Sequence, residues 1–242
     1  MAVSIVTGAA SGIGAATAGI LARRGDHVVC VDLDEAGAVR TADQLDRAIG
    51  VGADVTMAED CERMVAAALE QFGGIDAAVA CAGIEIGGPA LDIDPAMFRR
   101  VVDVNLTGSF LTAQAAARAM RSRGHGGAIV LIGSINSHMA LPGAAAYCAS
   151  KGGVRMLGKA LAVDLAPYSI RVNVVGPGVT DTPMSAETLA DPDRSARFVS
   201  RIPLGRAAAP DEIGAAVSFL TSEASSYVTG AFLTVDGGWL AG

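Results

Sequence analysis

A tyrosine and a lysine stand four residues apart in the stretch Tyr147-Cys148-Ala149-Ser150-Lys151, and Ser134 precedes this stretch. If the chain is helical from Tyr147 onward, the two side chains lie on one face, one turn apart. A phenol titrates near 10, but a fixed ammonium beside it favours the phenolate and lowers the pKa. A shift of about three units requires roughly 4 kcal/mol of differential stabilisation. The pair is therefore a candidate acid/base for the proton of an alcohol, although an ordinary tyrosine and a solvated lysine would show the same spacing.

The composition predicts a large apolar core and an acidic surface. Of 242 residues, 51% are hydrophobic, and the net charge is −7. No apolar run reaches the roughly 18 residues of a membrane span, and no run of five basic residues occurs, so we expect neither a membrane nor a nucleic acid as partner. The four cysteines are scattered and the three histidines form no metal-ligand pattern. We therefore expect free thiols, no metal, no signal peptide and a cytoplasmic location.

Short apolar runs alternate along the chain with helical patterns of about a dozen residues or more. The expected strands cover residues 3–7, 27–31, 51–53, 76–80, 128–132, 170–175 and 232–235, and the expected helices cover residues 15–24, 35–48, 58–72, 95–123, 147–166 and 210–220. Such alternation predicts an α/β fold with a parallel sheet and right-handed crossovers. No linker or fixed-period repeat interrupts it, so residues 1–242 are expected to form a single domain.

The first expected strand runs directly into Gly8-Ala9-Ala10-Ser11-Gly12-Ile13-Gly14, ahead of a helix. A strand, a glycine turn and a helix in this order present free backbone N–H groups where a pyrophosphate can bind. The Ser11 hydroxyl can add a further donor. The spacing is G-x-x-x-G-x-G rather than G-x-G-x-x-G, and in a chain with 30 glycines an ordinary tight turn is the alternative.

Polar residues follow several of the expected strands at their carboxyl ends. Asp32 can accept hydrogen bonds from both hydroxyls of an adenosine ribose and would repel a 2′-phosphate, whereas Asp34 is better placed to cap the next helix. Asp54 is expected either to contact a nucleobase or to stabilise a turn. Ser134 is expected either to cap a turn or to hold a substrate oxygen. Asn105, inside a helical segment, is expected to hold a relay water or to be a satisfied structural amide.

A polar stretch from Ser185 to Ser200 follows Thr180-Asp181-Thr182-Pro183-Met184. Long loops beside sites often close on a ligand, so the region from Met184 to Ile202 is a candidate substrate lid. Residues such as Asn136, His138 and Leu141 would shape the pocket beneath it.

Together these residues resemble the classical short-chain dehydrogenase/reductase family over essentially the whole chain. The resemblance implies a seven-stranded, doubly wound Rossmann-like sheet with helices on both faces, an often tetrameric enzyme, and no metal in its chemistry. The N-terminal half would mainly bind NAD, and residues 134–205 would supply catalytic residues and the substrate loop. The matching motifs are Thr7-Gly8-x-x-x-Gly12-Ile13-Gly14, Asp54-Val55, Asn105, Ser134, Tyr147-x-x-x-Lys151 and Pro177-Gly178.

By this resemblance Tyr147 would be the general acid/base, assisted by Lys151, while Ser134 would hold the substrate oxygen and Asn105 would anchor a relay water. The hydride chemistry would belong to the cofactor. The residues implied in cofactor binding are Gly8, Ser11, Gly12, Ile13, Gly14, Asp32, Leu33, Asp54, Val55, Cys81, Ala82, Gly83, Tyr147, Lys151, Pro177, Gly178, Thr180 and Thr182. Those implied in substrate binding are Ser134, Asn136, Tyr147 and Met184.

Two positions depart from the pattern of the family. Cys81-Ala82-Gly83 stands where Asn-Ala-Gly is usual, so an amide that braces the sheet is missing. We expect a small stability cost there, with cofactor binding retained through the backbone. Thr180 stands where an apolar residue is common, which weakens the assignment of its role.

The leading functional hypothesis is an NAD(H)-dependent alcohol or polyol dehydrogenase, or carbonyl reductase, acting on a secondary alcohol or a sugar hydroxyl and its ketone. The tract Tyr147-Cys148-Ala149-Ser150-Lys151-Gly152-Gly153 is similar to those of glucose- and polyol-type dehydrogenases. The alternative is a 3-oxoacyl-carrier-protein reductase, although Asp32 and the acidic surface count against it. A catalytically silent nucleotide-binding protein is a third hypothesis, which the presence of all four catalytic residue types disfavours.

Overall fold

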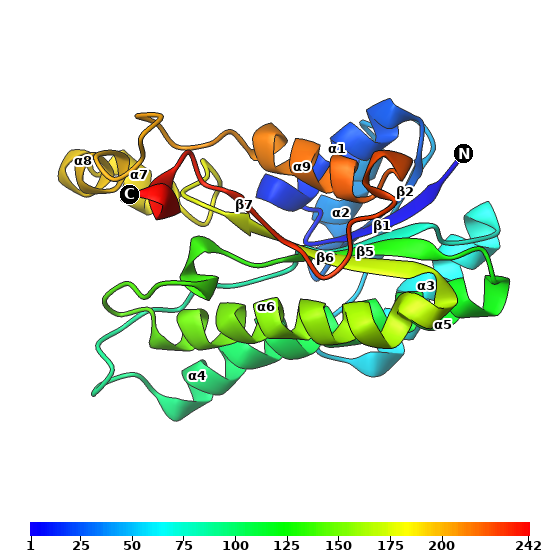
Figure 1. The fold of residues 1–242 in the computed structure, drawn as a ribbon, viewed down its shortest axis with the longest axis horizontal. Helices are drawn as coiled ribbons and strands as arrows, with labels where there is room; N and C mark the ends of the chain where they lie inside the picture. Colours follow the sequence, from blue (N-terminus) through cyan, green and yellow to red (C-terminus); the bar gives the residue numbers. More distant parts are fainter.

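The computed structural model describes residues 1–242, and its centre is one sheet of seven parallel strands (Figure 1). Their order, β3-β2-β1-β4-β5-β6-β7, confirms the predicted seven-stranded Rossmann-like sheet. Every neighbouring pair runs parallel. The strands are β1 (Val3–Thr7), β2 (His27–Asp32), β3 (Ala48–Gly52), β4 (Ala77–Ala80), β5 (Gly127–Ile132), β6 (Ile170–Pro177) and β7 (Phe232–Val235).

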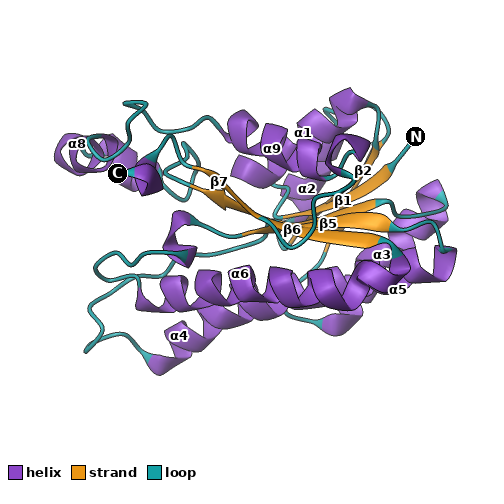
Figure 2. Cartoon of the chain, in the orientation of Figure 1, coloured by secondary structure: helices purple, strands orange, loops and turns teal.

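Helices cover both faces of this sheet, as Figure 2 shows. One face carries α1 (Gly12–Arg24), α2 (Glu35–Ala42) and α9 (Pro210–Leu220), and the other carries α3 (Ala58–Phe72), α4 (Pro95–Val102), α5 (Gly108–Arg123) and α6 (Ala145–Leu165). The short helices α7 (Ala186–Ala190) and α8 (Pro192–Val199) lie beyond one end of the sheet, close to the C-terminus. None of the helices combines the length and apolar character needed to cross a membrane.

Successive residues of the strands point to opposite faces and so build two cores. In β2, Val29 and Val31 pack into the core beneath α3, α5 and α6, whereas Val28 and Cys30 pack into the core beneath α1, α2 and α9. This follows from the two-residue period of a strand. Because both faces are covered, the strands read as continuous apolar runs rather than as alternating ones.

Three expected elements differ from the structure. The helix expected over 35–48 ends at Ala42, and β3 starts at Ala48, earlier than predicted. Arg47, directly before β3, adopts a left-handed backbone (φ 60°) that turns the chain into the strand. The helix expected over 95–123 is interrupted at Asp103–Thr107 by a π-helical turn between α4 and α5. The polar stretch 185–200 contains α7 and α8, the latter started by the Asp191 carboxylate, which accepts from two backbone N–H groups.

The strand order places a ligand crevice between β1 and β4. The chain builds outward from β1 to β3 and then returns to β4 on the other side, so the connections at the carboxyl ends diverge there. The turns that follow the two strands touch, since a Cβ at Gly8 would lie 2.9 Å from the Cα of Ala82. The predicted pyrophosphate turn and the predicted cofactor-binding segment Cys81-Ala82-Gly83 therefore meet at one edge of the sheet.

Candidate active site

Tyr147 and Lys151 occupy the first turns of α6 and share one face, as the spacing predicts. The Lys151 nitrogen lies 5.6 Å from the centroid of the Tyr147 ring. Lys151 is 4% exposed. Its Nζ donates to the carbonyl of Ile132, at the end of β5, over 2.7 Å. The lysine therefore ties α6 to β5, the strand that precedes Ser134.

Burial changes the pKa of both groups. Loss of hydration lowers the pKa of Lys151 to about 8. Burial also raises the pKa of Tyr147 above its usual value; the Glu85 charge adds to this, and hydrogen bonding to Ser134 only partly opposes it. The expected lowering of the phenol pKa by Lys151 together with a cationic nicotinamide ring stays a prediction, because in the chain alone burial outweighs it. Burial disfavours the phenolate, and the Lys151 ammonium donates to a carbonyl.

Ser134 follows β5 and starts a short turn, Ile135–Ser137. Its hydroxyl accepts from the N–H of Asn136 at 3.1 Å, so it does cap a turn, while it also faces the Tyr147 phenol closely enough to affect the pKa. Ser137 joins this turn to the catalytic helix, because its hydroxyl donates to the carbonyl of Lys151 at 2.8 Å. The two interpretations of Ser134 are therefore compatible.

Asn105 is fully buried in the π-helical turn, where its side-chain amide is saturated. Its Oδ1 accepts from the N–H of Ile84 at 2.8 Å, and its Nδ2 donates to the Ile84 carbonyl at 2.9 Å and to the Ser150 hydroxyl at 3.0 Å. Ser150 in turn donates to the carbonyl of Tyr147. This geometry supports the structural interpretation of the side chain and links the segment after β4, the π-helical turn and α6.

The turn from Gly8 to Gly14, where the sequence predicts a pyrophosphate site, has a tight backbone. Gly8 has a left-handed backbone (φ 70°), and a Cβ at Gly14 would lie 2.0 Å from the Gly8 carbonyl oxygen, so only glycine allows this turn to close. The Ser11 carbonyl accepts from the N–H of Ala15, but the Ser11 hydroxyl bonds to none of the N–H groups of α1. The first N–H groups of α1 are therefore left for an anion. Ile13 packs against the neighbouring core.

The Asp32 carboxylate is fixed at the end of β2. Its two oxygens accept from the N–H groups of Ala10 and Asp34, each at 3.0 Å. The next helix is capped by Asp34, whose carboxylate accepts from Gly37. The prediction that Asp34 caps the next helix is confirmed, and the ribose role of Asp32 stays a prediction. Leu33 between them is exposed, as an apolar residue at the edge of a ligand site would be.

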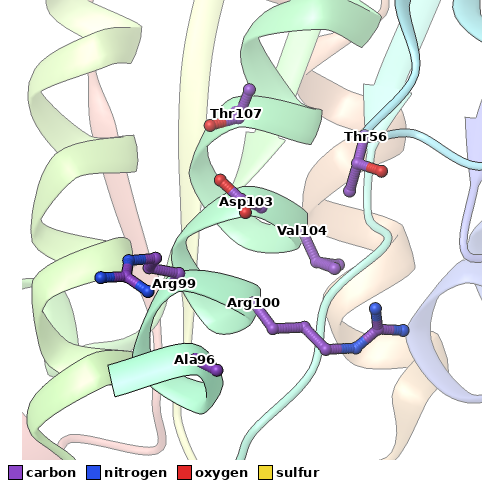
Figure 3. A pocket seen from close by; sticks show the side chains of 7 residues that line it. All are labelled: Thr56, Ala96, Arg99, Arg100, Asp103, Val104 and Thr107. Atoms are coloured by element: carbon purple, nitrogen blue, oxygen red, sulfur yellow. The ribbon is translucent and has the colours of Figure 1, made fainter.

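Asp54 and Val55 follow β3. The Asp54 carboxylate accepts from the N–H and the hydroxyl of Thr56, so it stabilises a turn, as one of the two interpretations expected. A pocket of about 470 Å³ borders this turn (Figure 3). It is lined by Thr56, Ala96, Arg99, Arg100, Asp103, Val104 and Thr107, and Figure 3 shows Arg99 and Arg100 pointing to different sides. None of the predicted catalytic residues lines this pocket. The candidate active site is therefore defined by the positions of Tyr147, Lys151 and Ser134, and not by this pocket.

The segment Cys81-Ala82-Gly83 is braced by Thr7. The Thr7 hydroxyl accepts from the N–H groups of Cys81 and Ala82, at 3.1 and 3.2 Å, and so holds this segment against the end of β1. Burial raises the pKa of the Cys81 thiol to about 12. A Cβ on Gly83 would lie 3.6 Å from the Lys151 nitrogen, so this segment passes directly beside the catalytic lysine.

The residues after β6 reach the same edge. Thr182 lies against the glycine turn, since a Cβ at Gly12 would be 3.3 Å from its Cβ. Thr180 is buried, and its hydroxyl donates to the carbonyl of Gly178, the residue after Pro177. Met184 is 51% exposed, so the structure does not bury it among the other predicted substrate residues.

The region expected to form a lid packs against the C-terminal segment. The ring centroids of Phe198 and Trp239 lie 5.8 Å apart, and the Arg201 guanidinium lies 4.6 Å from the centroid of the same Trp239 ring. Asn136 is buried and donates to the Cys148 sulfur at 3.3 Å. The roles that the sequence missed are those of Thr7, Glu85, Ser137 and Ser150. Glu85 and Ser137 belong to no recognisable motif, and Thr7 and Ser150 stand inside motifs but bond to residues far away in the chain.

Comparison with known proteins agrees with this geometry. A profile of the family described as Enoyl-(Acyl carrier protein) reductase matches residues 8–240. L-rhamnose 1-dehydrogenase (NAD(P)(+)) of Azotobacter vinelandii is 41% identical over 97% of this chain and 94% of its own. Cis-4-hydroxycyclohexanecarboxylate dehydrogenase of Sinomonas cyclohexanicum is 44% identical over 99% and 96%.

Among solved structures, a short-chain type dehydrogenase/reductase from Mycobacterium marinum superimposes with a TM-score of 0.95 at 38% identity, covering 100% of this chain and 96% of that one. The sequence relatives, the shared fold and the tyrosine–lysine pair at the sheet edge agree with one another. The chain belongs to the classical short-chain dehydrogenase/reductase family.

Proposed function

We propose that this protein is an NAD-dependent oxidoreductase that interconverts a secondary alcohol, or a hydroxyl of a sugar or polyol, with its ketone. The observation that carries the proposal is the chain of contacts joining the four catalytic residue types. Asn105 reaches Tyr147 through Ser150, and Lys151 reaches the strand before Ser134 through Ile132. The dehydrogenase relatives act, by their names, on a sugar and on a cyclic hydroxy acid, which supports alcohol chemistry here.

In the direction of oxidation, the Ser134 hydroxyl would hold the substrate oxygen and Tyr147 would take up its proton. When bound, an oxidised nicotinamide supplies the hydride acceptor and a positive charge beside the phenol. That charge would oppose the burial that raises the pKa of Tyr147 in this structure. Lys151 would orient the nicotinamide ribose and, while protonated, would favour the phenolate.

We propose that the nucleotide is held by the N-terminal half and that residues 134–205 provide catalysis and the substrate loop. The glycine turn and the free N–H groups of α1 would hold the pyrophosphate, Asp32 the adenosine ribose, and Asp54-Val55 the adenine. The backbone at Thr180 and the side chain of Thr182 would hold the carboxamide.

NAD is the proposed nucleotide because Asp32 would repel a 2′-phosphate, although one relative is named for both nucleotides. We expect Asp32→Ala to raise the ratio of kcat/KM for NADP to that for NAD on the order of tenfold, by removing like-charge repulsion. Asp34→Ala is the matched control, because it removes a neighbouring carboxylate that caps α2. If the ratio is unchanged in Asp32→Ala, Asp32 does not contact the adenosine ribose.

A 3-oxoacyl-carrier-protein reductase is the second candidate, favoured by the description of the matching family profile. The net charge of −7 disfavours binding an acidic carrier protein. A panel of secondary alcohols, polyols, sugars and acyl thioesters, followed by NAD- and NADP-linked absorbance, separates the two. We expect turnover of alcohols with NAD. If only acyl thioesters are turned over, and only with NADPH, the protein is a 3-oxoacyl-carrier-protein reductase instead.

We further propose a homotetramer located in the cytoplasm. The family resemblance supports the first statement, and the four free cysteines fit a reducing compartment. Sedimentation of the purified protein would test the assembly.

A further inference from the structure

Glu85 carries an acidic side chain into the neighbourhood of the catalytic pair. It lies in the segment between β4 and α4, directly after Ile84, whose N–H and carbonyl are both bound by the Asn105 side chain at 2.8 and 2.9 Å. Further along, the N–H of Gly88 donates to the carbonyl of Gly143, in the loop before α6, at 2.9 Å. Glu85 is therefore held between two anchors, one on each side.

The surroundings of Glu85 belong to the active site. Two residues earlier, a Cβ on Gly83 would lie 3.6 Å from the Lys151 nitrogen. The negative charge of Glu85 raises the pKa of both Tyr147 and Lys151, in agreement with the short path along the chain from Glu85 to Gly83 beside the Lys151 nitrogen. Partial burial raises the pKa of Glu85 itself, and Lys151 only partly offsets this.

The carboxylate nevertheless has no partner within the chain. The side chain is exposed to solvent at the edge of the site, and none of the eight ion pairs of the structure includes it. A carboxylate is an acceptor with room for several hydrogen bonds. Its oxygens are therefore available to a bound molecule whose reacting oxygen lies at Tyr147.

Chemistry restricts what such a molecule can be. A hydroxyl next to the reacting carbon can donate to a carboxylate and can also accept from the protonated form, so it suits Glu85 in either state. A carboxylate on the substrate would be repelled. A substrate that is hydrocarbon apart from its reacting hydroxyl would displace water from Glu85 and offer the carboxylate no hydrogen bond in return.

We propose that Glu85 is a substrate-binding residue that accepts a hydrogen bond from a second hydroxyl of the substrate, so that the site selects neutral diols, polyols or sugars over carboxylated alcohols. This inference rests on the proposed dehydrogenase function and names its substrate class. Glu85 positions the substrate and sets specificity; the proton still moves at Tyr147.

The test compares cis-1,2-cyclohexanediol, cyclohexanol and 4-hydroxycyclohexanecarboxylate, each oxidised with NAD by wild type and by Glu85→Gln. We expect wild type to prefer the diol and to handle the carboxylate worst. In Glu85→Gln, the ratio of kcat/KM for the diol to that for cyclohexanol should fall about tenfold, mainly through KM, because a charge-assisted hydrogen bond is weakened. The carboxylated substrate should improve. Glu70→Gln, an exposed glutamate on α3, is the matched control and should leave both ratios unchanged.

Several outcomes would overturn the inference. If wild type oxidises cyclohexanol as well as the diol, or if the two ratios are the same in Glu85→Gln and wild type, Glu85 does not select a second hydroxyl. Turnover of any of the three alcohols would leave the proposed function standing in that case. If wild type oxidises none of them with NAD, both fail together. Binding of NADH to Glu85→Gln checks that the variant is folded.

Discussion

Replacing Lys151 with methionine should make the protein inactive and at the same time change how its stability depends on pH. The lysine is almost fully buried, and burial lowers its pKa from 10.5 to about 8. Methionine fills a similar volume without a charge. The substitution therefore separates the energetic cost of the buried ammonium from the packing of α6.

The size of the effect follows from proton linkage. Below about pH 8 the folded and unfolded states both keep the Lys151 proton, whereas between about pH 8 and 10.5 only the unfolded state keeps it. Because the unfolded state then binds more protons, the free energy of unfolding rises with pH. The full gap of about 2.5 units corresponds to roughly 3.4 kcal/mol, of which roughly 2 kcal/mol is gained between about pH 7 and about pH 9.5.

Urea unfolding of both proteins at several pH values, at equal protein concentration and without nucleotide, measures this gain. The wild type should gain roughly 2 kcal/mol relative to Lys151→Met between the two pH values. Other titrating groups are common to both proteins and largely cancel in the difference. The variant also loses the hydrogen bond to Ile132, but this loss changes little with pH. If the difference in unfolding free energy between the two proteins stays constant with pH, burial does not lower the pKa of Lys151.

Three further substitutions, two of them with a matched control variant, test Thr7, Gly14 and Ser134. Thr7→Val should lower the free energy of unfolding by about 1–3 kcal/mol, because the N–H groups of Cys81 and Ala82 lose their acceptor, whereas Thr17→Val should cost little, because its buried hydroxyl has no partner. Gly14→Ala should greatly weaken NADH binding, since its Cβ meets the Gly8 carbonyl, whereas Gly152→Ala in α6 should be tolerated, since nothing lies within 4 Å of its Cβ. Thermal melting and NADH fluorescence measure these effects. Equal losses for Thr7→Val and Thr17→Val, or normal NADH binding by Gly14→Ala, would contradict the account. Ser134→Ala should lower kcat more than the affinity for NADH, and a lower affinity for NADH alone would place Ser134 outside the chemistry.

Local sequence patterns were sufficient to predict the sheet and the main helices. Continuous apolar runs marked strands buried on both faces, and the i, i+4 spacing placed Tyr147 and Lys151 on one face of α6. The motif residues gather at the carboxyl edge because parallel strands deliver them there. The predicted end of α2 and start of β3 were wrong. The left-handed turn before β3 is at Arg47, and no glycine in the sequence marks it.

The details that depend on distant contacts could not be read from the sequence. In the π-helical turn, the Asn105 amide binds the backbone of Ile84, which lies in the segment after β4, about twenty residues earlier in the chain. The raised pKa of Tyr147 depends on burial and on Glu85, neither of which the local motif contains. The bracing role of Thr7 likewise depends on two strands meeting.

The most direct test of the account is Tyr147→Phe, which removes only the hydroxyl that is proposed to carry the substrate proton. We expect turnover of alcohol with NAD to fall by about a thousandfold, within the range for loss of a general acid/base. The dissociation constant for NADH, measured by fluorescence on the same protein, should stay within about threefold of wild type, because the ring and the Lys151–Ile132 contact remain. Turnover within about tenfold of wild type would show that the proton moves elsewhere and would contradict the central claim.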